Sequence, residues 1–199
     1  MSNACAKRIH VYAEMRMCMR RRLDDNGFSL VELIIVIAIM AVLTGSAFSV
    51  LGYINNGNVK KCSRSINSGL NETRTANLTR EGTSYLYIYK YNGDIYKRIS
   101  KADDLSLSGT GDKQLDDSGE RIGNKSVHII GYYDDASGKE QKFDFENESE
   151  PMIKISFRKG DGGFSNSTTF YKKIEVKKDE GAISFVHMVK ETGRFFIEN

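Results

Sequence analysis

The stretch FSLVELIIVIAIMAVLTGSAFSVL, residues 28–51, contains 24 residues and a single charged side chain, Glu32. A helix needs about 20 apolar residues to cross the hydrocarbon core of a bilayer, so this segment has the length and composition of a transmembrane helix. An arginine triplet at 20–22 precedes it, and no comparable basic cluster immediately follows. The positive-inside rule therefore predicts that residues 1–27 stay in the cytoplasm and that the chain after the apolar segment is exported.

Two ordinary membrane segments fit the same composition. A secretory signal peptide would have its apolar region at 33–43 and would be cut after Ala47, in the small-residue sequence GSA. An uncleaved signal anchor would retain the segment. Neither interpretation gives a role to Glu32. Because an acid at the centre of a spanning helix costs about 2.5–3.5 kcal/mol on insertion scales, such a residue is interpreted first as a functional group with a partner.

The order of Gly27, Phe28, Glu32 and the apolar run resembles the N-terminal signature of type IV prepilins and pseudopilins. The resemblance covers only this part of the chain, and Asp24 and Asp25 lie where basic residues are common in the family. It implies that a prepilin peptidase cleaves between Gly27 and Phe28 and then N-methylates Phe28, and that the apolar segment is retained.

The resemblance also implies a partner for Glu32, which is the N-terminal amine of a neighbouring subunit. In or beside lipid, an amine and a carboxylate each lack a counter-charge until they meet. Low dielectric makes their attraction strong and an unpaired charge expensive. Such pairing would favour a correctly inserted subunit over a misplaced one.

A second helical segment is expected after a weak point. Residues 52–58, GYINNGN, are poor helix formers and predict a weak point, bend or break. Spacing of three and four then places one set of small and apolar residues on one face: Val59, Cys62, Ile66, Leu70, Thr73 and Ala76. This amphipathic continuation is expected to end near Gly82 and to pack on a sheet, with Cys62 as a small apolar contact.

From Tyr85 the period changes to two, which indicates strands. YLYIYKY at 85–91 alternates tyrosines with Leu86, Ile88 and Lys90, and NGD at 92–94 is a strong hairpin signal before IYKRI. Further strands are predicted at 127–133, 141–145, 152–158, 168–177, 182–189 and 194–197. The stretch 101–123, rich in Ser, Gly and Asp, is expected to be a long loop with at most short structure.

These elements predict an α+β fold, in which a long N-terminal helix packs by its second half on an antiparallel β-sheet domain, as in pilins. The expected organisation is a cytoplasmic leader at 1–27, a transmembrane or filament-core helix at 28–51, an amphipathic continuation at 52–82 and an extracytoplasmic β domain at 83–199. Two of the three cysteines lie in the leader, so a disulfide framework is excluded.

Charge argues against a nucleic-acid-binding domain. Residues 1–27 hold six Lys or Arg and three acids, which accounts for the whole net charge of +3 and leaves the rest neutral. This count does not exclude a local basic patch that forms when the chain folds.

Catalytic signals are weak. His128 and His187 have no second His or Cys at metal-ligand spacing and are interpreted as structural. GERIGNKS at 119–126 has the wrong spacing for a phosphate-binding loop. The acids of 101–123 indicate a solvated loop, with a calcium site as the alternative. The tyrosine stripe of 85–91 is interpreted as sheet packing or as a binding surface.

The sequence therefore predicts a structural pilin or pseudopilin subunit, with no enzyme activity and no cofactor. Its expected partners are the prepilin peptidase, other pilin subunits, the pilus assembly platform and, before assembly, the membrane. It would cross the plasma (inner) membrane once, with its C-terminal domain outside, and later enter an extracellular or periplasmic filament. The alternatives are a minor pseudopilin of a type II secretion or DNA-uptake system, and a membrane-anchored or secreted binding domain that does not polymerise.

Overall fold

The computed structural model describes residues 29–178 and 181–198, without the side chains of 46–56. The described residues belong to two units that are divided between Ser46 and Ala47, and each unit is described separately. Helix α2 (Leu30–Thr79) runs through 52–58 without interruption, so the break predicted there is absent, and a weak point or bend stays a prediction. Intrinsic propensities are weak preferences that the surrounding sequence overrides. No helix among the described residues is long and apolar enough to qualify as a membrane span.

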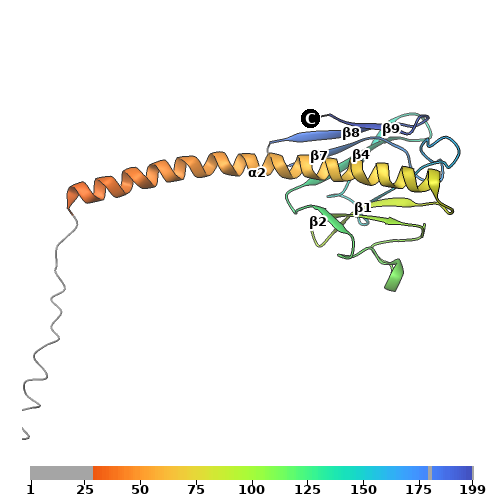
Figure 1. The fold of residues 1–199 in the computed structure, drawn as a ribbon, viewed down its shortest axis with the longest axis horizontal. Coiled ribbons are helices and arrows are strands. Elements are labelled where there is room, and N and C mark those ends of the chain that lie inside the picture. Colours follow the sequence, from red (N-terminus) through yellow and green to blue (C-terminus); the bar gives the residue numbers. More distant parts are fainter. Residues whose placement is uncertain (1–28, 179–180, 199) are drawn as a thin grey trace, which may run out of the picture. The chain divides into compact units, whose positions relative to one another are not determined.

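The second unit contains two antiparallel sheets beside the C-terminal part of α2 (Figure 1). The first sheet has the order β3 (Glu120–Gly123), β2 (Asp94–Ser100), β1 (Tyr85–Tyr91) and β6 (Met152–Ser156). The second has the order β5 (Glu140–Asp144), β4 (His128–Asp134), β7 (Tyr171–Lys177), β8 (Ile183–Val189) and β9 (Arg194–Glu198). The prediction of an α+β fold with an antiparallel β-sheet domain is confirmed.

The predicted strands are all present, with ends that differ from the prediction by three residues or fewer. The NGD hairpin is confirmed, because Asn92 and Gly93 have φ values of 50° and 87°, as a type I′ turn requires. Strand β3 was not predicted. It lies in the stretch 101–123 together with a short 3₁₀ turn, η1 (Gly111–Lys113), and pairs with β2 through an irregular register.

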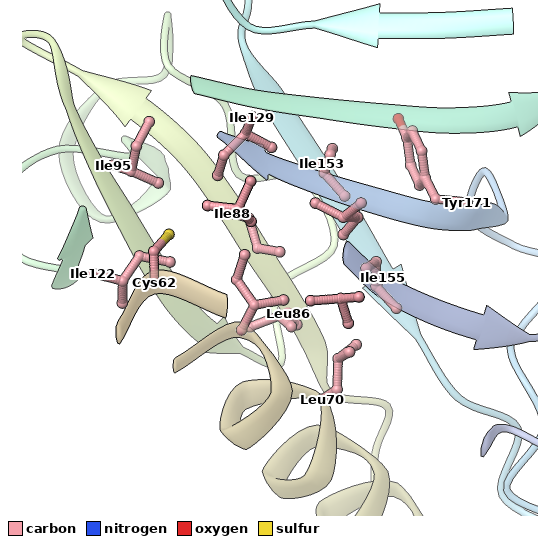
Figure 2. Close-up of a cluster of buried hydrophobic side chains, with 14 of the residues drawn as sticks. Cys62, Leu70, Leu86, Ile88, Ile95, Ile122, Ile129, Ile153, Ile155 and Tyr171 are labelled. Atoms are coloured by element: carbon pink, nitrogen blue, oxygen red, sulfur yellow. The ribbon is translucent and has the colours of Figure 1, made fainter. Parts of the chain in front are cut away.

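The main core lies between α2 and both sheets, and Figure 2 shows side chains of the helix meeting those of β1, β2 and β6. The predicted inner face of the helix is confirmed, since five of its residues have no exposed surface and the sixth is 7% exposed: Val59, Cys62, Ile66, Leu70, Thr73 and Ala76. Burying an aliphatic side chain stabilises the fold by about 1.5–3 kcal/mol. Packing on the sheets therefore stabilises the helix from Val59 onward.

The tyrosine face of β1 forms a second core. Tyr87 and Tyr89 are fully buried beneath Leu105 and Leu115 of the long loop. The Tyr87 hydroxyl donates to the Ala102 carbonyl oxygen at 2.7 Å, and the Tyr89 hydroxyl makes an equivalent bond to the loop, also at 2.7 Å. Burial raises the pKa of both phenols to about 12. This face packs against the loop, so the interpretation as an open binding surface is wrong.

The last two turns of α2 are joined to the sheets by polar contacts. Asn77 is 1% exposed, and its Nδ2 donates to the carbonyl oxygens of Ser84 and Phe157 at 3.0 and 3.1 Å. The Ser84 N–H donates to Asn77 Oδ1 at 2.6 Å. Arg74 Nε donates to the Gly162 carbonyl oxygen at 3.1 Å. These bonds fix the end of the helix relative to β1, β6 and the loop that follows β6.

Candidate functional site

Glu32 lies in the first turn of α2, and its side chain is exposed. The Leu33 N–H donates to the Ser29 carbonyl oxygen at 3.1 Å, which continues the helical bonding to the start of the described chain. Unpaired N–H groups at a helix start give it a partial positive charge, which favours a carboxylate there. Gly27 and Phe28, the predicted processing residues, lie outside the described residues.

About the first four turns of α2, from Leu30 to Leu43, present apolar side chains in every direction. Eleven large hydrophobic residues between Leu30 and Leu43 are 45% to 73% exposed. A helix that is apolar on all sides is normally buried in protein or lipid, and an exposed apolar surface of this size marks an interaction site. The start of α2 therefore combines one carboxylate, that of Glu32, with an exposed apolar surface that is suited to contact with other apolar groups.

Comparison with known protein families gives a match that covers this segment. Residues 22–48 match the family model described as the prokaryotic N-terminal methylation motif, which is the type IV prepilin signature. The match includes Gly27, Phe28 and Glu32. No curated protein and no solved structure matches the chain.

The motif indicates a type IV pilin-like protein that is processed as a prepilin. The signature is one of structural pilin-type proteins rather than of enzymes, and it implies membrane anchoring before incorporation into a surface filament.

The two histidines of the β domain each contact a carboxylate. His128 Nδ1 lies 2.8 Å from Glu146 Oε1, and His187 Nε2 lies 2.7 Å from Glu198 Oε2. His187 also stacks on the Phe196 ring, at a centroid distance of 5.1 Å. The described part of the chain contains no group of three or more His, Cys, Asp or Glu residues that could hold a metal ion.

Acids of the long loop make local contacts. Asp104 pairs with Lys113, and the hydrogen bond from that lysine lowers the pKa of the carboxyl. The carboxylate of Asp116 accepts from the Ser118 N–H at 3.0 Å. The near-match to a phosphate-binding loop, 119–126, contains the whole of β3 and does not open a helix, so it lacks the geometry of a phosphate cradle.

A polar groove, which sequence analysis did not find, follows one flank of α2 beside β2 and β3. Its central part has a volume of about 780 Å³. Lys97 lies in its wall with a side chain only 8% exposed, and its Nζ is 3.2 Å from Glu120 Oε2 and donates to the Ser65 carbonyl oxygen at 3.3 Å. Lys60, Lys61 and Arg64 of the helix, together with Glu72, also line it.

Two smaller hollows adjoin this central part. One of about 400 Å³ shares Ser68 and Glu72 with it, and one of about 260 Å³ shares Lys61 and includes Arg121 of β3. We call the three together the flank groove. The sequence does indicate an exposed basic helix face, through Lys60, Lys61 and Arg64. The opposite wall comes from strands more than thirty residues further along the chain, so sequence spacing could not reveal it.

Proposed function

We propose that this chain is a structural subunit, a pilin or pseudopilin, of a type IV pilus-like filament. The observation that carries the proposal is the prokaryotic N-terminal methylation motif over 22–48, together with the exposed apolar side chains of the helix between Leu30 and Leu43. Prepilin peptidase would cut between Gly27 and Phe28 and methylate Phe28. The retained helix would then leave the membrane and pack against other pilin subunits on the assembly platform.

The proposed organisation follows the same logic. Residues 1–27 are the cytoplasmic leader, 28–51 the membrane and filament-core helix, 52–82 its amphipathic continuation, and 83–199 the exported β domain. The subunit crosses the inner membrane once before assembly and afterwards belongs to an extracellular or periplasmic filament. Support comes from the 24 residues of 28–51 with one charge, and from the basic residues that precede them.

Mass spectrometry of the mature N-terminus tests the processing step. We expect a chain that begins with N-methylated Phe28 in cells that contain a prepilin peptidase. The control is Gly27→Leu, which should leave the leader attached because the peptidase reads the small residue before the cut. A wild-type chain that begins at Phe48, or one that keeps its leader, would refute the proposal.

Replacement of Glu32 tests the assembly step. Cleavage creates a cationic amine at Phe28, and removing one partner of a pair in low dielectric leaves the other charge uncompensated, at about 3–5 kcal/mol. Glu32→Ala should therefore be cleaved and methylated normally, while the fraction recovered in sheared filaments falls strongly on immunoblots. Glu81→Ala, at an exposed glutamate just after α2, is the matched control. Normal filament incorporation of Glu32→Ala would remove the pairing argument.

A further inference from the structure

The flank groove is open and mainly basic. Its central part is lined by four cations and only two acids, Glu72 and Glu120, and Glu120 already pairs with Lys97. Within the described residues, Lys60, Lys61 and Arg64 have no ion-pair partner among the bridges closer than 4.0 Å. Three neighbouring cations on one helix flank repel one another, so an acidic segment placed between them would be stabilised.

An acidic segment is present elsewhere on the same domain. The loop 144–150, DFENESE, joins β5 to β6 and holds Asp144, Glu146, Glu148 and Glu150 without a cation. We call it the acidic loop. Asp144 accepts from the Glu146 N–H at 3.0 Å, which holds the loop in shape, and residues 146–150 are exposed. Glu146 contacts Lys90, whereas Glu148 and Glu150 have no ion-pair partner in the described chain.

The part of the flank groove that contains Lys61 and the acidic loop lie at opposite edges of the first sheet. The groove borders β3, at one edge, and the loop leads directly into β6, at the other. Three strand spacings of about 4.8 Å separate these edges, or roughly 14 Å. The acidic loop and the basic residues of the groove are therefore separate patches of one molecule, so a contact between them can join two copies. A contact between two different patches is head-to-tail, and it adds copies into an open helical filament when the rotation between neighbours does not close a ring.

We propose that the acidic loop of one subunit lies in the flank groove of its neighbour, with Glu148 and Glu150 facing Lys60, Lys61 and Arg64. The inference rests on the proposed function, since it names a contact between filament subunits. Charge complementarity of this kind contributes register and specificity more than affinity. The exposed apolar helix would supply the affinity, and the groove would select one lateral arrangement among the many that an apolar surface allows.

Disulfide trapping in cells that express the full-length chain tests the contact. The double variant Lys61→Cys with Glu148→Cys should give a ladder of dimers, trimers and higher species on mild oxidation, because each subunit offers one thiol to each neighbour. Either single variant can give at most a dimer. Lys61→Cys with Glu191→Cys is the matched control, since Glu191 is an exposed acid on the β8–β9 turn. Only the processed chain is scored, because cleavage after Gly27 removes Cys5 and Cys18. The remaining native cysteine, Cys62, is buried and does not interfere.

Charge reversal gives an independent measurement on the same sheared filaments. Reversing Lys61 and Arg64 to Glu, or Glu148 and Glu150 to Lys, should each lower the filament fraction about tenfold, since like charges then face each other. Combining the two reversals should restore it to within about twofold of wild type. Lys159→Glu, an exposed lysine after β6, should have no effect.

Two results would overturn the inference. The first is the absence of a ladder in the Lys61/Glu148 double variant. The second is a filament fraction that stays low in the combined reversal, which would assign the groove to a different anionic partner. N-methylation of Phe28 is measured in the same cells. A methylated chain without the ladder would refute this contact alone, whereas an unprocessed chain would refute the proposed function.

Discussion

Asn77→Ala is expected to destabilise the β domain more than any exposed substitution on α2. Asn77 is buried, donates to the carbonyl oxygens of Ser84 and Phe157, and accepts from the Ser84 N–H. The Ser84 carbonyl also accepts from the Ser156 hydroxyl at 3.1 Å, so it keeps a partner in the variant. The Ser84 N–H and the Phe157 carbonyl would lose this partner while buried.

The magnitude follows from those two groups. An unsatisfied buried backbone group costs about 1–3 kcal/mol, so the free energy of unfolding should fall by about 2–6 kcal/mol. Urea denaturation of the full chain, followed by circular dichroism of the sheets, measures this change. Asn71→Ala is the matched control, because Asn71 is exposed on the same helix and its replacement should change stability by a few tenths of a kcal/mol.

Equal losses in the Asn77 and Asn71 variants would contradict the reasoning. They would mean that the last turns of α2 are held by the apolar face alone. An intermediate loss, of about 1 kcal/mol, would mean that the two backbone groups find new partners after a local shift.

Three further predictions concern the β domain. Burial raises the pKa of the Cys62 thiol to about 12, so iodoacetamide at pH 8 should label it only after unfolding, as measured by mass spectrometry. Gly131→Ala would place a Cβ 2.6 Å from the facing tyrosine ring of β7 and should lower the free energy of unfolding by about 1–3 kcal/mol, whereas Gly160→Ala, in open space, should not. Hydrogen bonds from Lys90 and a histidine hold the pKa of Glu146 below its ordinary 4.5. Its stabilising contribution is therefore present above that value and lost as pH falls through the folded pKa, so acid titration should destabilise wild type more than Glu146→Gln.

Local patterns predicted the elements but not their assembly. The alternation of 85–91 and the two positive-φ residues of the β1–β2 turn are neighbours in sequence, so the hairpin could be predicted. The inner face of α2 follows in the same way from three- and four-residue spacing. The separation into two sheets depends instead on which distant strands pair, such as β1 with β6, and a single strand carries no signal of its partner.

Some residues of the candidate sites could likewise be predicted from local sequence, and others could not. Gly27, Phe28 and Glu32 lie within six consecutive residues, so their resemblance to the prepilin signature is visible in the sequence alone, and their roles in processing and assembly stay predictions. Lys97 looked like any strand lysine, and only the folded chain places its ammonium beside Glu120 and the Ser65 carbonyl. The stretch 101–123 was predicted to be a solvated loop, with a calcium site as the alternative. Its Leu105 and Leu115 cover the tyrosine face because two apolar side chains in a polar segment suffice to close a small core.

The residues of the main core are far apart in the sequence, and this separation limits how early in synthesis the core can be completed. Its members begin at Val59, and Phe195 and Ile197 of the last strand pack against it. At synthesis rates of about 5–20 residues per second, on the order of ten seconds pass between the first and the last of them. Throughout that interval the inner face of α2 has no complete cover. A long-range core of this kind also folds more slowly than one built from local contacts. We therefore expect the nascent chain to need protection from aggregation until its five-stranded sheet is complete.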